Sequence, residues 1–204
     1  MAITRWTASR SATALASTTT SPASVSQPSR AASSRGSAPR SRRSASWLVS
    51  APSRPARSSE SEDESGPLLA QLAEEAGADV AAMEVIPDDF ALIEDRLHHY
   101  VDDGFALIFT TGGTGFTPDD ITPEATRAVI EREAPGIAEA MRAESLRHTP
   151  MGVLSRGVAG ISYRTLIINF PGSPKAVGEL FPVVAPVLEH AVRTLQREHG
   201  GSSH

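Results

Sequence analysis

The chain has 204 residues and a formal net charge of −5, and its length fits one α/β domain with additional sequence. Residues 1–59 contain nine arginines and no Asp or Glu, whereas residues 60–204 carry a net charge of −14, so broad nucleic-acid binding is a poor interpretation. Because the chain lacks cysteine and any apolar run near the roughly 18 residues that span a bilayer, we expect a soluble cytoplasmic protein without disulfides, thiolate sites or membrane partners.

Residues 1–59 are mainly Ser, Ala, Arg, Pro and Thr without a sustained period. They offer little apolar surface to offset the entropy of ordering, so we expect disorder there. Three interpretations stay open: a flexible tail, an Arg- and Ser-rich transit peptide, or a stretch translated outside the native reading frame. The folded domain is predicted over residues 60–204.

From Ser65 onward, helices and strands are predicted to alternate, which favours a mostly parallel sheet. The segment "SGPLLAQLAEEAG" predicts a helix with Ser65 as its N-cap, "ADVAAMEVI" a strand, and "DDFALIEDRLHHYVDDG" a second helix. The apolar "FALIFTT" is typical of a strand buried on both faces. Two further helices are predicted over 122–133 and 137–148, short strands within 152–170, and a last helix over 173–198, bent or divided near Pro182 and Pro186.

The segment "TTGGTG" follows the apolar strand, where open α/β sheets bind their ligands. Gly112, Gly113 and Gly115 can adopt positive φ and let a phosphate approach backbone N–H groups, and Thr111 and Thr114 add hydroxyl donors. The loop has neither the Lys-Ser/Thr of a Walker loop nor the spacing of the dinucleotide fingerprint. On the glycines alone, a tight turn is as good an interpretation as a phosphate site.

Two aspartates favour the phosphate interpretation. Asp120 follows the glycine loop, and Asp88 follows the preceding predicted strand, so both reach the same edge of the sheet. Carboxylates beside a phosphate repel it unless a divalent cation lies between them, and Mg²⁺ suits that position. Asp88 would serve equally well as the N-cap of the following helix, and Asp119 is better interpreted as a solvated turn residue.

The segment "NFPGSPKAV" offers a second anion site after an apolar strand. Pro171 and Pro174 stiffen the turn, Gly172 permits close approach, and Ser173 and the next helix N-terminus supply donors. Taken alone, this loop is better interpreted as an ordinary strand–turn–helix connection. The six histidines show no ligand spacing, and there is no G-x-S-x-G elbow to support a covalent hydrolase.

Five motifs follow one another over residues 63–177, within a likeness that covers roughly residues 63–196: "DESGP", "IPDD", "TTGGTGFTPDDITPEAT", "LSRGVAG" and "LIINFPGSPKAV". In this order they resemble the MoaB/Mog family of molybdenum-cofactor biosynthesis, whose enzymatic type is molybdopterin adenylyltransferase. The resemblance implies a three-layer α/β sandwich, a homotrimer, and MgATP-dependent adenylylation of molybdopterin with release of pyrophosphate. It also implies the molybdenum-insertion enzyme of the same pathway as a partner.

The resemblance also assigns roles to residues of this chain. Asp88 and Asp120 would be catalytic and would hold the Mg²⁺. The phosphate would be cradled by Thr111, Gly112, Gly113, Thr114 and Gly115. The pterin and phosphate pocket would be lined further by Ser65, Ser155, Pro171, Gly172, Ser173 and Pro174. Phosphoryl chemistry of this kind relies on positioning and charge neutralisation and needs no protein nucleophile.

The chain departs from the family at its front. Members begin with a central strand ending in a V-S-D/S-R-like stretch and a glycine-containing loop, whereas here only Trp47 to Ser50 match, at the wrong spacing. This favours the reading-frame interpretation and predicts that a central strand is missing, which would expose unpaired backbone and threaten activity. A non-catalytic molybdopterin-binding member is therefore the alternative function, and an inert, damaged chain is a third hypothesis.

Overall fold

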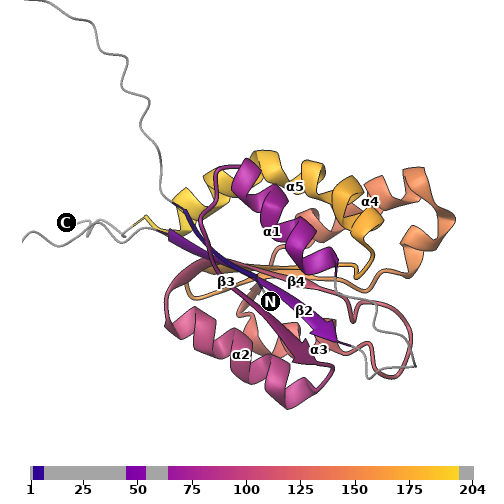
Figure 1. Cartoon of the computed structure of the whole chain (residues 1–204), viewed down its shortest axis with the longest axis horizontal. Coiled ribbons are helices and arrows are strands. Elements are labelled where there is room, and N and C mark those ends of the chain that lie inside the picture. Colours follow the sequence, from indigo (N-terminus) through magenta and orange to yellow (C-terminus); the bar gives the residue numbers. More distant parts are fainter. Residues whose placement is uncertain (1, 7–44, 54–63, 198–204) are drawn as a thin grey trace, which may run out of the picture. The chain divides into compact units, whose positions relative to one another are not determined.

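A mixed sheet with helices on both faces forms the part of the chain that the computed structural model describes (Figure 1). That part comprises residues 2–6, 45–53 and 64–197, with side chains over 64–197. The strands are β1 Ala2–Trp6, β2 Ala45–Ser53, β3 Val80–Pro87, β4 Phe105–Thr111, β5 Arg132–Glu133, β6 Ala159–Ser162 and β7 Thr165–Phe170. The helices are α1 Ser65–Glu75, α2 Phe90–Asp102, α3 Thr122–Val129, α4 Pro135–His148, the 3₁₀ turn η1 Pro150–Leu154, and α5 Pro174–Leu195.

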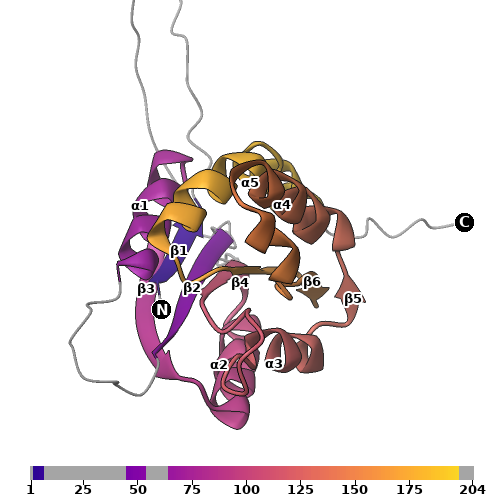
Figure 2. The same cartoon turned by 90° about the vertical axis from the view of Figure 1, so that its right-hand side faces the viewer.

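The strands lie in the order β1-β3-β2-β4-β7-β6-β5. The four central strands, β3, β2, β4 and β7, are parallel, and the outer strands pair antiparallel with their neighbours. Helices α1, α4 and α5 cover one face of the sheet and α2 and α3 the other (Figures 1 and 2). This confirms the predicted three-layer α/β class and places the carboxyl ends of β3, β4 and β7 at one edge.

The central strand predicted to be missing is present in the backbone. β2 pairs in parallel with both β3 and β4, for example with Val49 opposite Met83 and Leu48 opposite Ile108. Residues 2–6 and 45–53 therefore form strands within the segment for which we expected disorder. The remainder of residues 1–59 lies outside the described residues, so its three interpretations and the boundary at residue 60 stay predictions.

Two apolar cores lie on opposite faces of the sheet. β4 divides between them with the period of two that a strand imposes: Leu107 and Phe109 pack with α1, α4 and α5, and Ile108 packs with α2 and α3. Its residues from 106 to 111 are all buried, which confirms the strand buried on both faces. None of the described helices is both long and apolar enough to cross a membrane.

Helix α5 is one helix through both of its prolines, so it is not divided there, which was one of the two forms that the sequence predicted. Pro182 and Pro186 are four residues apart and both are exposed, so they share the solvent face of the helix. The opposite face buries Val177, Leu180, Phe181, Val184, Leu188 and Val192. Burial of this stripe offsets the cost of about 3 kcal/mol that an interior proline carries.

Candidate active site

The loop after β4 runs from the carboxyl end of that strand to the start of α3. Gly112 and Gly113 have φ angles of 88° and 62°, in the left-handed region that favours glycine. The Gly112 N–H donates to Phe170 O, at the end of β7, over 3.0 Å, and the Thr122 N–H donates to Gly113 O over 3.2 Å. The loop is therefore tied to the neighbouring strand on one side and to α3 on the other.

Asp88 follows β3 and lies beside the same loop. A Cβ placed on Gly113 would lie 3.4 Å from Asp88 Oδ1 and only 2.2 Å from Thr122 Oγ1, so glycine alone allows the loop this close to both groups. The N-cap of α2 is Asp89, whose side chain accepts from the Leu92 N–H over 2.9 Å. The capping role that the sequence also allowed for Asp88 is therefore wrong.

Asp120 lies in a turn just before α3. Its Oδ2 accepts from the Thr117 N–H over 2.7 Å and from the Thr117 hydroxyl over 2.6 Å, and its own N–H donates to Thr117 O over 3.0 Å. A Cβ on Gly115 would lie 2.8 Å from Asp120 Oδ2, so this carboxyl group is packed against the glycine loop. Asp119 is exposed, in agreement with its interpretation as a turn residue.

The two predicted loops meet at their glycines. A Cβ on Gly172 would come within 3.0 Å of the Gly112 Cα, so the loop after β7 packs directly on the loop after β4. Ser173 is the N-cap of α5, without a side-chain capping bond, and Pro174 is at the first turn of that helix. The N-terminus of α5 therefore lies next to the glycine loop, as the parallel order of β4 and β7 requires.

Ser65 and Thr111 form a buried pair at the base of the site. The Ser65 hydroxyl donates to Thr111 Oγ1 over 3.1 Å, and these residues are 3% and 1% exposed. Ser65 is the first residue of α1, whose N-cap is Glu64, so the predicted capping role of Ser65 is wrong. The pair ties α1 to the end of β4, and neither residue lines the pockets described next.

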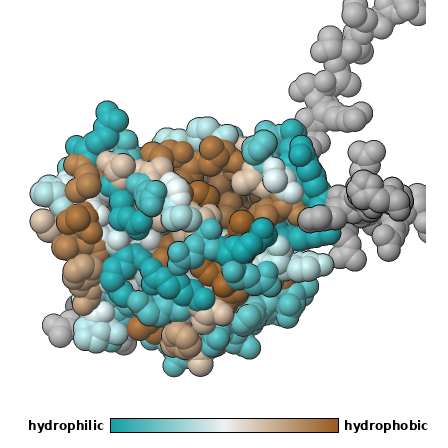
Figure 3. All heavy atoms as spheres, turned by 180° about the vertical axis from the view of Figure 1, so that it is seen from behind, coloured by the Kyte–Doolittle hydropathy of each residue, from teal (hydrophilic) through white to brown (hydrophobic). Residues whose placement is uncertain are grey.

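A pocket of about 360 Å³ opens on one side of the glycine loop. Its apolar walls come mainly from α4, η1 and α5, and polar groups converge on it from the loops. Of the predicted residues, Thr114, Gly115, Ser155 and Pro171 line it. The other lining residues are Ala138, Met141, Arg142, Ser145, Thr149, Met151, Gly152, Leu154, Gly157, Asn169, Ala176 and Leu180. Leu146 of α4 and Val153 of η1 are exposed apolar residues that do not line the pocket. Figure 3 shows apolar patches between hydrophilic ones on the face of the molecule opposite to the view of Figure 1.

A second, more open hollow of about 460 Å³ lies around Asp120. It is lined by Phe116, Thr117, Pro118, Asp120, Ile121, Glu124 and Arg156. The glycine loop therefore borders both spaces, with Gly115 on the wall of the apolar pocket and Asp120 on the wall of this hollow. Asp88 lines neither of them and approaches the loop from the β3 side.

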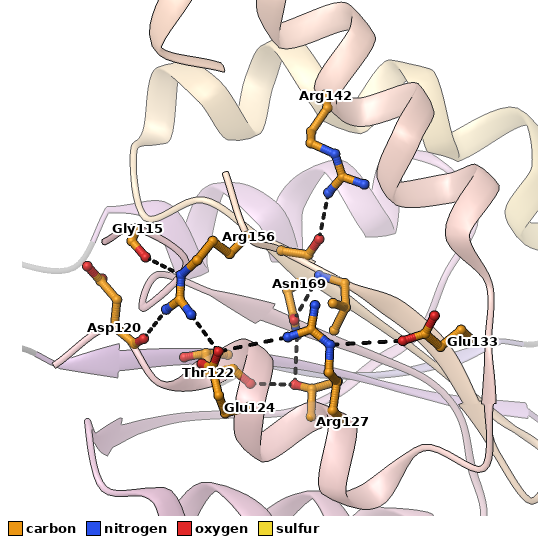
Figure 4. A network of polar contacts seen from close by, with 12 residues as sticks. Gly115, Asp120, Thr122, Glu124, Arg127, Glu133, Arg142, Arg156 and Asn169 are labelled. Atoms are coloured by element: carbon orange, nitrogen blue, oxygen red, sulfur yellow. Dashed lines mark hydrogen bonds and ion pairs between the residues drawn. The ribbon is translucent and has the colours of Figure 1, made fainter. Parts of the chain in front are cut away.

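Sequence reasoning assigned no role to Arg156, although it lies in this site. Its guanidinium reaches three groups at once: Nε donates to Gly115 O over 2.6 Å, one amino group contacts Asp120 O, and the other contacts the Glu124 carboxylate (Figure 4). Its backbone N–H donates to Thr114 O over 3.0 Å. The only sequence signal was its place in "LSRGVAG", where Ser155 alone was assigned a role.

Asn169 was likewise unassigned, although it lies in a quoted motif. Its Nδ2 donates to Thr110 Oγ1 over 2.8 Å and to Thr126 Oγ1 over 2.9 Å, and its Oδ1 accepts from the Val158 N–H over 3.2 Å. With 3% of its surface exposed, Asn169 joins β4, α3 and the segment before β6 behind the apolar pocket (Figure 4). The full use of its amide group indicates a structural role.

The oxygen atoms around the loop fit a small hard cation. Asp88 and Asp120 approach it from β3 and from the turn before α3, and Thr122 Oγ1 is buried without a hydrogen bond within the described part of the chain. Mg²⁺ is commonly held by one or two carboxylates together with substrate phosphates, so two carboxyl groups suffice. Over residues 64–197, no three His, Asp or Glu side chains form a cluster that could hold a metal by themselves.

Comparison with protein families gives one match that covers most of the chain. The family described as "Probable molybdopterin binding domain" matches residues 46–190. That range includes β2 as well as both loops and both aspartates of the site.

Individual relatives match more than half of the chain. The molybdenum cofactor synthesis protein cinnamon of Drosophila melanogaster is 43% identical over 135 residues, which are 65% of this chain and 22% of that protein. The molybdopterin adenylyltransferase of Haemophilus influenzae is 45% identical over 121 residues, which are 58% of this chain and 61% of that protein. The chain thus covers less than two thirds of the length of either relative.

Solved structures of similar proteins are matched over nearly their whole length. The molybdopterin biosynthesis enzyme MoaB of Thermus thermophilus superposes with a TM-score of 0.66 at 43% identity, over 73% of this chain and 96% of that one. A molybdopterin biosynthesis protein of Mycobacterium abscessus gives a TM-score of 0.67 at 39% identity, over 72% of this chain and 94% of that one.

Proposed function

Because the chain belongs to the family of probable molybdopterin-binding domains, we propose that it acts in molybdenum cofactor biosynthesis as a molybdopterin adenylyltransferase. In this reaction it would use ATP and Mg²⁺, transfer AMP to the terminal phosphate of molybdopterin, and release pyrophosphate. One observation carries the proposal: a bare glycine loop is flanked by Asp88 and Asp120 and borders a pocket large enough for a small heterocycle. The names of two curated relatives and two solved structures support the same pathway.

We place the binding site of the pterin ring in the apolar pocket. Its walls include Met141, Leu154 and Leu180, which suit the faces of a flat ring, and Ser145 and Ser155 supply polar groups for its edge. The volume of about 360 Å³ lies within the range of small-ligand sites.

The proposed phosphate site lies at the glycine loop. Gly112 and Gly113 present backbone without a Cβ, and the N-terminus of α5 adds a partial positive charge from beside Gly172. The loop that would hold the phosphate borders the apolar pocket at Gly115 and the hollow at Asp120, whereas Gly112 and Gly113 line neither space. That position suits a reaction that joins the pterin phosphate to a nucleotide.

Asp88 and Asp120 would hold the Mg²⁺, which when bound neutralises charge on the phosphate oxygens. The protein residues mainly bind and orient. An oxygen of the pterin phosphate attacks the α-phosphorus of ATP, a new P–O–P linkage forms, and the bond between the α- and β-phosphates breaks as pyrophosphate leaves. No side chain becomes covalently attached, so the catalytic contribution is in-line positioning and electrostatic stabilisation.

Pterin binding without turnover is the alternative, and one observation favours it. Asp120 Oδ2 already accepts two hydrogen bonds from Thr117, which a cation ligand at that atom would have to share. From the family resemblance we also propose a homotrimer, a cytoplasmic location and the molybdenum-insertion enzyme as a partner. Sedimentation, fractionation and pull-down with that enzyme test these three points.

The deciding experiment measures pyrophosphate release from MgATP with and without molybdopterin, on the full chain shown to be folded by circular dichroism. We expect release that depends on the pterin. Asp120→Asn should abolish turnover while pterin binding remains, and the matched control Asp119→Asn, at an exposed neighbour, should retain both. Pterin binding without release by the unsubstituted chain would establish the binding-only alternative instead.

A further inference from the structure

We propose that Arg156 is a positioning residue that holds the Asp120-bearing turn in the place that the reaction needs. This inference rests on the proposed adenylyl transfer. It is carried by the three simultaneous contacts of one guanidinium with Gly115, Asp120 and Glu124 (Figure 4).

The contacts of Arg156 enclose the turn from both ends. Gly115 O lies before the exposed residues 116–119, and Asp120 O lies after them, so one side chain joins the start and the end of this segment. Inside the turn, the hydrogen bonds run between Thr117 and Asp120. These internal bonds shape the turn, and the side chain of Arg156 and the bond between Thr122 and Gly113 help to attach it to the rest of the domain.

Glu124 fixes the direction of the guanidinium. Its carboxylate pairs with Arg156 and also lies 3.8 Å from Arg127, whose Nε lies 3.9 Å from Glu133. Glu124 lies in the first turn of α3, so the network connects the turn to the helix that follows it. With 31% of its side chain exposed, Arg156 is shielded enough for these contacts to be more than a solvated surface pair.

The arrangement needs arginine in particular. A planar guanidinium offers five N–H groups in a fixed fork, so it can donate to two carbonyl oxygens and a carboxylate in different directions. Lysine keeps the charge but has one compact donor centre, which cannot meet these three acceptors in the same geometry. Arg156→Lys therefore preserves the charge of the site and tests the positioning alone.

The inference predicts a specific change in kinetics. Misplacement of a catalytic group by about 1 Å can lower the rate about 100-fold. In Arg156→Lys we expect kcat to fall at least about tenfold and the Mg²⁺ concentration for half-maximal rate to rise. The KM for the pterin should change little, because Arg156 does not line the apolar pocket. Arg156→Gln should lose more activity than Arg156→Lys, because only the lysine variant keeps the positive charge.

Arg96→Lys is the matched control. Arg96 lies on α2, has 37% of its side chain exposed, pairs with Glu84 and lines neither the apolar pocket nor the hollow around Asp120. We expect it to keep the unsubstituted kcat and Mg²⁺ dependence. A binding titration with Mn²⁺ as the probe, followed by electron paramagnetic resonance on the full chain with ATP present, adds a readout that does not depend on turnover. Weaker Mn²⁺ binding in Arg156→Lys than in Arg96→Lys is the expected result.

The outcomes separate this inference from the proposed function. If the unsubstituted chain releases no pyrophosphate, adenylyl transfer fails, and the Mn²⁺ titration alone decides whether Arg156 positions the aspartate. If the unsubstituted chain is active and Arg156→Lys matches it in kcat and in Mn²⁺ affinity, the positioning role is overturned. A parallel loss of pterin binding and of thermal stability in Arg156→Lys would also overturn it, because that pattern indicates a general structural role.

Discussion

Replacing Asn169 with alanine should destabilise the domain strongly, because this one side chain makes three buried hydrogen bonds. The substitution leaves the buried Val158 N–H without its side-chain acceptor, and removes one hydrogen bond each from Thr110 and Thr126. An unsatisfied buried donor costs about 1–3 kcal/mol, and each of the other two bonds contributes about 1 kcal/mol net. We therefore expect the free energy of unfolding to fall by about 3–5 kcal/mol.

The measurement is equilibrium urea unfolding followed by circular dichroism, at one fixed protein concentration. The matched control is Gln196→Ala, which removes an amide side chain that donates to Arg164 O over 3.2 Å at the end of α5. That single, partly exposed bond should be worth about 1 kcal/mol or less. A loss below about 1 kcal/mol for Asn169→Ala, or a loss equal to that of the control, would show that the buried network does not stabilise the fold as reasoned here.

Two further substitutions test the backbone of the site and the titration of a buried phenol. Gly113→Ala combines a φ of 62° with a Cβ 2.2 Å from Thr122 Oγ1, so the melting temperature should fall by an amount equivalent to at least about 2 kcal/mol. Adding Thr122→Ala should restore part of that loss, and no restoration would argue against the clash. The pKa of Tyr100 is raised above its ordinary value of 10.0, first by burial and then by its hydrogen bond to Glu84. Because the folded state favours the neutral phenol, the contribution of Tyr100 to stability is complete below about pH 10 and is lost as the pH rises further. Between pH 8 and pH 11, the melting temperature should therefore fall more steeply for the unsubstituted chain than for Tyr100→Phe.

Local sequence patterns predicted most elements of the domain, although the helix predicted over 122–133 ends at Val129 and its last two residues form β5. The apolar run of β4 predicted a strand buried on both faces, and the glycines at 112 and 113 predicted positive φ angles; both predictions are confirmed. Each rests on the residue types of a short segment alone. The proximity of the two loops also followed from sequence, because parallel strands end at one edge of the sheet. Capping was less predictable, since Ser65 and Asp88 are each one position away from the residue that caps the helix.

Long-range contacts explain what sequence reasoning missed. Arg156 reaches Gly115, 41 positions earlier, and Asn169 reaches Thr110, 59 positions earlier. Neither separation leaves a periodic or spacing signal, because the partners meet only after the sheet has assembled. That α5 is not divided at its prolines could not be predicted for a related reason: the side on which a proline lies, and the burial that compensates for it, depend on the packing of the whole helix.

The contact between Gly112 and Gly172 has a mechanical consequence for the two loops. At this point the loop after β4 and the loop after β7 touch backbone to backbone, with no side chain between them to change rotamer. A displacement of one loop is therefore transmitted directly to the other, and a larger residue at position 172 would push against the backbone of Gly112. The loop after β4 and the start of α5 should consequently open and close as one body, with a shared rate of amide hydrogen exchange.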